Sequence, residues 1–451
     1  MKKVAISFLA IAPFLVVMFT AFNPPKVQAV PSYARQTGLP CSGCHYTPPE
    51  LNAAGRRFKL LGYVDRDKDT KVVKDDSGKK HAALDLLASL PLSAMFETSF
   101  TAANTPQPGT RNGTFELPQD ISLFLSGAWT SHLGSFVQVT YDKQDDHFSI
   151  DNTDIRYANL KMVDGKEFIY GITLNNNPTV EDLWNDTPAW GFPWISDDFE
   201  PTPTASPFIR GLLAQDVAGV GGYAMWDKHL YLDATIYASD QVGVQQPNPG
   251  TGFNFNIRGI APYWRVAWQQ ETAKSEFEVG TYGMHLESTP NAITGLRDAY
   301  TDWAVDLQYD RTLFRTDVFS LRATYIGENS TLAATFNAEG AQRINHYLGT
   351  AMADAEYHFG NHVSGTFGWF DTGGTVDSAL YSPSALTGSA NGNPRSAGFI
   401  GNISFWPIQN IQLAAQYTGY TRFNGAATNY DGAGRNASDN NVVYLLGRFV
   451  F

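Results

Sequence analysis

The sequence predicts an all-β fold, a 16-stranded antiparallel transmembrane β-barrel with a short N-terminal helical segment. Aromatic residues make up 13% of the chain and charged residues only 17%, which is typical of strands. Beyond residue 85, apolar and polar residues alternate and helical spacing is rare. The connections between these alternating segments are short and long in turn, as in outer-membrane barrels.

The stretch "HLYLDATIYAS" at 229–239 illustrates the alternation. Leu230, Leu232 and Ile236 point to one side of an extended strand, and Tyr231 and Asp233 point to the other. A soluble β-sandwich would alternate in the same way, with its apolar face inside, so this period alone does not identify a barrel. The connection lengths are the observation that favours a membrane barrel.

Sixteen segments have this pattern, and their ranges are 90–103, 118–131, 134–142, 149–163, 166–176, 214–226, 229–239, 258–270, 274–287, 299–310, 317–328, 344–358, 361–372, 396–405, 410–423 and 440–451. Short connections near residues 132, 163, 227, 359 and 407 take every second place. The longest of the others are 177–213, 240–257, 373–395 and 424–439. Because periplasmic turns are short, an even number of strands predicts that both termini are periplasmic.

The last strand predicts a division between lipid and lumen. Tyr444 and Arg448 should face the lumen. The alternate residues are apolar and should face lipid, namely Val443, Leu445, Phe449 and Phe451. A barrel of this strand number leaves a lumen wide enough for water.

The first 29 residues have the features of a signal peptide. Lys2 and Lys3 precede an uncharged run from 4 to 25, and "VQA" at 27–29 offers small residues for cleavage. A retained membrane anchor is the alternative. We therefore expect a signal peptide at 1–29, followed by a short segment with its linker at 30–80 and a porin-like barrel at 81–451.

The two cysteines of the chain belong to one motif. Cys41, Cys44 and His45 form CxxCH, in which two thiols can bond covalently to haem vinyl groups while the adjacent imidazole ligates the iron. A disulfide or a redox CxxC pair is the alternative, although neither needs the histidine. The motif predicts one covalent haem c with His45 as the proximal ligand. Residues 30–80 are therefore expected to form a monohaem cytochrome c segment with its linker.

The segment from Val30 to about Asp75 is too short to build a core that covers a haem. The nearest cover is the barrel lumen, so we expect the segment to lie in or against the periplasmic mouth as a plug. Within it, a short helix is expected from Pro48 and Pro49 to Gly62, with Glu50 in its first turn.

An apolar stripe of this helix could pack on the porphyrin or on barrel side chains, and its residues are Leu51, Ala54, Phe58 and Leu61. Arg56, Arg57 and Lys59 could pair with haem propionates or a lumen carboxylate, or remain solvated. The sixth iron ligand stays open. His81 is expected to be a linker residue. The barrel residues Met95, His132 or His229 could reach the plug, and an open or water-bound sixth position is the other alternative.

The stretch "ARQTGLPCSGCHYTPPELNAAGRRFKLLGY" at 34–63 resembles the haem segment of the outer-membrane fused cytochrome-porins, the monohaem iron oxidases of iron-oxidising bacteria. Weaker similarity lies in "NNNPTVEDLWNDTPAWGFPW" at 175–194 and "IAPYWR" at 260–265. The resemblance implies an oxidoreductase of the Fe(II):cytochrome c reductase type in a Gram-negative outer membrane. Electrons from extracellular Fe(II) would pass through one haem to a periplasmic c-type cytochrome, with Cys41, Cys44 and His45 holding that haem.

The net charge of −12 argues against nucleic acid as a partner and allows metal cations. Carboxylates in predicted loops could hold a hard divalent ion at the extracellular mouth, or could bind divalent ions between lipopolysaccharide molecules. These residues are Asp145, Asp146, Glu181, Asp182, Asp186, Asp197, Asp198 and Glu200.

Two other functions remain open from the sequence. One is a solute porin whose haem is a structural or sensory plug, and the other is an electron conduit running outward to extracellular acceptors. Hydrolase functions are not indicated, because the chain contains no GxSxG, HExxH or phosphate-binding glycine loop.

Overall fold

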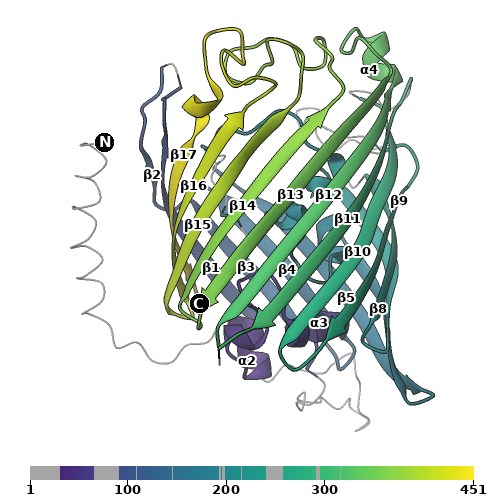
Figure 1. Cartoon of the computed structure of the whole chain (residues 1–451). Coiled ribbons are helices and arrows are strands. Elements are labelled where there is room, and N and C mark those ends of the chain that lie inside the picture. Colours follow the sequence, from purple (N-terminus) through teal and green to yellow (C-terminus); the bar gives the residue numbers. More distant parts are fainter. Residues whose placement is uncertain are drawn as a thin grey trace.

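A computed structural model describes residues 31–65, 91–107, 109–144, 146–191, 194–195, 199–214, 216–239, 257–290, 295–314 and 316–451. The chain forms a closed antiparallel barrel of sixteen strands, which confirms the predicted fold class (Figure 1). Its strands are β1 Leu92–Ala103, β2 Thr114–Glu116, β3 Asp120–Ala128, β4 Leu133–Asp142, β5 His147–Val163, β6 Lys166–Asn175, β7 Val217–Trp226, β8 Leu230–Ser239, β9 Ala261–Glu271, β10 Ser275–Ser288, β11 Asp298–Thr312, β12 Val318–Leu332, β13 Asn345–Phe359, β14 Val363–Gly374, β15 Ser396–Ile408, β16 Ile411–Arg422 and β17 Val442–Val450.

The short strand β2 and the strand β3 occupy one position in the barrel. Both pair with β1, with Ser99 opposite Glu116 in β2 and Met95 opposite Ser122 in β3. The other edge of β1 pairs with β17 and closes the barrel. Each of the sixteen predicted segments corresponds to one of these positions.

Alternation along the strands separates an apolar exterior from a polar lumen. In β11, Asp302 and Asp306 are buried, whereas Trp303 and Val305 are exposed. The last strand follows its prediction, since Val443 is exposed and Tyr444 is buried with its hydroxyl donating to Gln119. An apolar outer band around a polar interior is the arrangement of outer-membrane barrels. No helix in the described ranges is long and apolar enough to cross a membrane.

Described residues of the connection between β6 and β7 fold into the lumen, and we call 176–191, 194–195, 199–214 and 216 the inward segment. Val180, Glu181 and Leu183 have no exposed surface. Arg156 of β5 donates to the backbone carbonyl of Val180 at 2.8 Å, and Thr235 of β8 donates to Glu181 at 3.1 Å. The longest predicted loop therefore exists, but much of it packs inside the barrel.

The N-terminal segment contains α2 Pro31–Thr37, the short 3₁₀ helix η1 Cys41–Gly43 and α3 Ala53–Leu60. The prediction that the helix begins at Pro48 and Pro49 is wrong, because Asn52 caps it by accepting hydrogen bonds from the backbone amides of Ala54 and Gly55. Glu50 is therefore outside the first turn. The end of the helix is as predicted, with Gly62 in the left-handed region at φ 74°.

Candidate functional site

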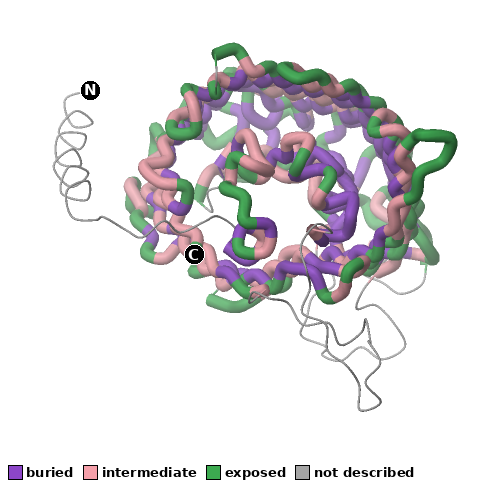
Figure 2. Tube along the Cα trace, turned by 90° about the horizontal axis from the view of Figure 1, so that it is seen from below, coloured by how far each residue is buried: buried purple, intermediate pink, exposed green. Residues whose placement is uncertain are grey.

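The N-terminal segment, residues 31–65, lies inside the end of the barrel that carries the short turns. Figure 2 views this end and shows the chain folded within the ring of strands. Glu50 accepts a hydrogen bond from Arg322 of β12 at 2.7 Å. Arg56 contacts Glu271 of β9 at 2.9 Å and Glu276 of β10 at 2.8 Å. These ion pairs fasten the segment to separate parts of the wall, so it occupies the barrel mouth as its length suggested.

The same segment is bonded to the inward segment. The backbone amide of Leu51 donates to the carbonyl of Trp184 at 2.9 Å. The ammonium of Lys59 donates to the carbonyl of Asp182 at 2.7 Å and to the side chain of Asn185 at 2.8 Å. The two segments therefore pack as one body within the lumen.

A cavity of about 430 Å³ lies between these two segments and the barrel wall. Cys41, Cys44 and His45 all line it, and the two cysteines form no disulfide. Its volume is within the range of about 300–1,000 Å³ that is usual for cofactor sites. Wall residues from both sides of the barrel closure complete it, namely Met95, Phe124, Phe136, Gln138, Asn152, Glu356, Asn402, Ser404, Gln412, Arg448 and Val450.

A tight turn presents the CxxCH motif to this cavity. The backbone amides of Cys44 and His45 both donate to the carbonyl of Cys41, at 3.0 and 2.9 Å. The Cys41 amide donates to the side chain of Gln409, in the turn between β15 and β16, at 3.1 Å. Burial raises the pKa of the Cys44 thiol. The motif is thus held by its own turn and by the barrel.

The ring of His45 is oriented by its neighbours. Its Nδ1 makes a 2.9 Å hydrogen bond with the carbonyl of Glu50, which leaves Nε2 for a metal. Burial lowers the pKa of the imidazole and favours the neutral form that ligates metals. Metal-ligating histidines commonly donate the other ring nitrogen to a carbonyl in this way.

Helix α3 approaches the motif closely at Gly55. A Cβ atom there would lie 2.3 Å from the carbonyl oxygen of Cys44. Leu51 and Phe58 from the predicted apolar stripe line the cavity, and Phe58 packs edge-on against Tyr33 with ring centres 5.0 Å apart. Two thiols, a neutral imidazole and aromatic walls around one cavity are the residues that could hold a haem c.

The inward segment supplies a part of the cavity that the sequence analysis missed. Trp190, Trp194 and Ile195 line it, and Lys59 lies over the Trp190 ring at 5.4 Å from its centre. Burial, followed by the charge of Arg156, lowers the pKa of Lys59 to about 7. The tryptophan-rich composition of 184–194 was the signal that could have found this wall.

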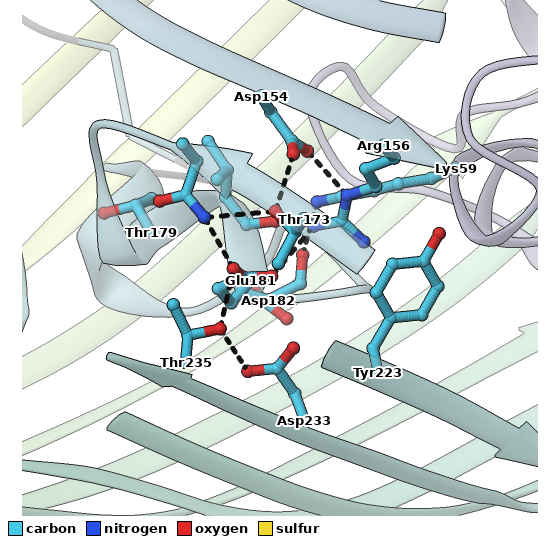
Figure 3. Close-up of polar contacts among 12 residues, drawn as sticks. Lys59, Asp154, Arg156, Thr173, Thr179, Glu181, Asp182, Tyr223, Asp233 and Thr235 are labelled. Carbon is cyan, nitrogen blue, oxygen red and sulfur yellow. Dashed lines mark hydrogen bonds and ion pairs between the residues drawn. The ribbon is translucent and has the colours of Figure 1, made fainter. Parts of the chain in front are cut away.

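Paired charges hold the inward segment in place (Figure 3). Arg156 contacts Asp154 at 2.7 Å and Glu181 at 3.1 Å, and Thr173 donates to Asp154 at 3.1 Å. Thr235 bridges the carboxylates of Glu181 and Asp233. All six residues are buried, so the charges lie in a network of hydrogen-bonded partners.

A second arginine joins the two stretches of weaker similarity. Arg265 of β9 contacts Asp182 at 3.4 Å and Asp306 at 2.6 Å, and its guanidinium lies 5.0 Å from the centre of the Trp184 ring. Asp182 and Trp184 of the first stretch therefore meet Arg265 of the second inside the lumen. The expectation that Glu181 and Asp182 could hold a cation at the mouth is wrong, because both carboxylates are buried inside the lumen and contact Arg156 and Arg265.

The structure places the other predicted site residues in different surroundings. Arg56 and Arg57 pair with carboxylates of the barrel, Arg57 with Glu167. His132 and His229 do not line the cavity, and each makes a hydrogen bond to a backbone carbonyl. Asp145, His81, Asp197 and Asp198 lie outside the described residues. In the described part of the chain, no group of three or more His, Cys, Asp or Glu residues could hold a metal ion.

No protein-family model and no curated protein matches this sequence. Among solved structures, the chain is similar to the outer-membrane channel DcaP of Acinetobacter baumannii, with 11% identity, a TM-score of 0.45 and coverage of 80% of this chain and 96% of that one. It is also similar to OmpF of Salmonella typhi in complex with daunomycin (12%, 0.46, 80% and 97%) and to an anion-selective porin of Comamonas acidovorans (12%, 0.45, 80% and 99%). The likeness concerns the barrel fold alone.

Proposed function

We propose that the chain is an outer-membrane electron-transfer protein that holds one covalent haem c and oxidises extracellular Fe(II), passing electrons to a periplasmic cytochrome. The observation that carries this proposal is that Cys41, Cys44 and His45 line a single cavity inside the barrel end. A haem bound there would supply a one-electron redox centre. The resemblance of residues 34–63 to the cytochrome-porins supplies the donor.

Different residues of the site would attach the cofactor, ligate its iron and cover it. The thiols of Cys41 and Cys44 would form the two thioether bonds, and Nε2 of His45 would ligate iron while Glu50 orients the ring. Leu51 and Phe58 exclude water from the cavity side of α3. Burial of this kind is one of the levers that set a haem potential.

The barrel gives the site a position suited to oxidation of an external metal. In our proposal both termini and the short turns face the periplasm, so the cavity would lie near that side of an apolar band about 25 Å tall. Oxidised iron precipitates near neutral pH, and transfer of electrons alone keeps the product outside the cell. The Fe(II) ion is a substrate here and needs no passage through the lumen.

The test is anaerobic stopped-flow mixing of the oxidised full-length protein, produced with cytochrome c maturation, with Fe(II). We expect covalent haem that survives denaturation and a haem reduction rate that saturates with iron concentration. A protein reduced by dithionite but not by Fe(II) would remove iron as the donor. A chain without covalent haem would end the proposal.

The porin-like fold favours a second function, the passage of small solutes. Porin barrels of this size enclose an aqueous channel, but here the N-terminal and inward segments lie in the lumen. Planar-bilayer conductance separates the two functions, since an electron-transfer barrel should conduct weakly beside an open porin of equal strand number. Outward electron flow to extracellular acceptors would instead show as haem oxidation by those acceptors.

A further inference from the structure

The cavity offers few groups that could ligate a second axial position of a haem. Besides the CxxCH motif, the described residues that line it and carry a suitable donor atom are Tyr33, Lys59, Tyr63, Met95 and Glu356. None of the described histidines other than His45 lines the cavity. These five are the candidates for a sixth ligand from this part of the chain.

The two phenols are unsuited to this role. Tyr33 donates its hydroxyl to the carbonyl of Ser135 at 2.7 Å, and Tyr63 donates to Asp154 at 2.5 Å. Burial raises the pKa of both tyrosines well above the usual value. Neither would supply a phenolate to iron at neutral pH.

The two charged candidates already have partners. Lys59 donates to the backbone carbonyl of Asp182 and to the side chain of Asn185, at 2.7 and 2.8 Å, and would have to give up these buried hydrogen bonds to ligate iron. Glu356 accepts from Arg322 at 2.8 Å and lies 3.2 Å from a ring nitrogen of His358. Withdrawing Glu356 would leave the buried Arg322 without one of its carboxylate partners.

Met95 has none of these obstacles. It occupies an inward position of β1, between the buried Ser93 and Glu97. In the β-sheet it pairs with Val450 of β17, which also lines the cavity, so its backbone position is fixed by the barrel. A thioether is neutral at every pH and needs no hydrogen bond, and its three rotatable bonds allow it to adapt. The remaining four methionines of the described ranges do not line the cavity.

Given the haem of the proposed function, we infer that Met95 is the sixth ligand of its iron. The site would then have histidine and methionine ligation, which raises the reduction potential of a c-type haem. A raised potential favours acceptance of electrons from a weak reductant such as Fe(II). The sequence distance of 50 residues between His45 and Met95 explains why the motif alone did not identify the ligand.

The experiment compares the full-length, haem-loaded chain with Met95→Leu, Met95→His and Met225→Leu. Met225 is a matched control, because it is buried inside the barrel and does not line the cavity. The readouts are the far-red charge-transfer band of ferric iron bound to thioether sulfur, the shifted methionine methyl signal of the ferrous protein in NMR, and the midpoint potential.

We expect the band and the methyl signal in the wild type and in Met225→Leu, and their loss in Met95→Leu with a lower potential and new binding of carbon monoxide. Met95→His should also lose the band but give a low-spin spectrum of two imidazole ligands, which shows that the position reaches the iron. If the haem-loaded wild type lacks the band, or if Met95→Leu keeps it, the assignment of Met95 is wrong while the proposed function stands. A wild-type chain without haem would overturn the proposed function as well.

Discussion

The close approach of α3 to the haem-attachment turn leads to a sharp prediction for Gly55→Ala. A Cβ at this position would lie 2.3 Å from the Cys44 carbonyl oxygen and 2.9 Å from a methyl carbon of Leu51, inside the 3.0 Å below which such contacts essentially do not occur. The contact at 2.3 Å is with backbone, so no side-chain rotation can relieve it. Either the helix or the turn that carries Cys44 has to move.

The magnitude follows from two opposing effects. Overpacking of this kind costs about 1–3 kcal/mol, while replacing glycine by alanine within a helix gains up to about 1 kcal/mol. We expect a net loss of about 1 kcal/mol in the docking free energy of the N-terminal segment. Displacement of the Cys44 thiol should also lower the fraction of chains that carry covalent haem.

The assay measures haem per chain after denaturation, together with the rate at which protease cleaves the N-terminal segment of the folded barrel. Ala54→Gly is the matched control, because residue 54 is exposed in the same helix and the change costs about 1 kcal/mol of helix propensity without a clash. Gly55→Ala should lose haem, and Ala54→Gly should keep it. Equal haem content in Gly55→Ala and wild type would refute the role of this contact.

Three further outcomes are expected. Replacing both Cys41 and Cys44 by Ala should abolish covalent haem, seen in denaturing gels, while the barrel keeps its heat-modifiable mobility. Arg322→Met leaves the buried Glu50 without its cation, which typically costs about 3–5 kcal/mol, so protease should release the N-terminal segment faster. Burial lowers the pKa of Lys59 to about 7, below the ordinary value of 10.5. Between these two pH values the undocked state binds more protons than the docked state, so docking of the N-terminal segment should strengthen as pH rises from about 7 to 10.5. The rate of protease cleavage, measured across this pH range, reports the trend. Lys59→Met should remove it.

The barrel strands were predictable because each is encoded locally. Alternation of lipid-facing and lumen-facing side chains is visible within ten residues of sequence, as in β8 and β11, and turn chemistry marks the ends. The haem-attachment motif is equally local. These features therefore needed no knowledge of distant contacts.

The inward segment and the start of α3 could not be predicted in this way. Glu181 and Asp182 look like solvated loop carboxylates until Arg156 and Arg265 are brought to them by strands far away in the sequence. Glu50 likewise looks like a first-turn helix residue until Arg322 of β12 is known to face it. In each case the position of the backbone depends on an ion pair with a residue far away in the sequence. The periodicity of a single segment does not identify that partner.

The ion pairs of the lumen explain how a short segment can hold one position in a wide barrel. Buried pairs of charges often stabilise less than apolar packing of the same volume, since both ions lose their water. Their benefit here is specificity: Glu50 binds β12 and Arg56 binds β9 and β10, with Tyr63 bonded to Asp154 of β5. Attachments to three separate parts of the wall define a single orientation of the N-terminal segment, whereas a segment held only by apolar contacts could rotate. The motif is thereby held against a fixed set of wall residues, and a ligand contributed by the wall can then be reliable.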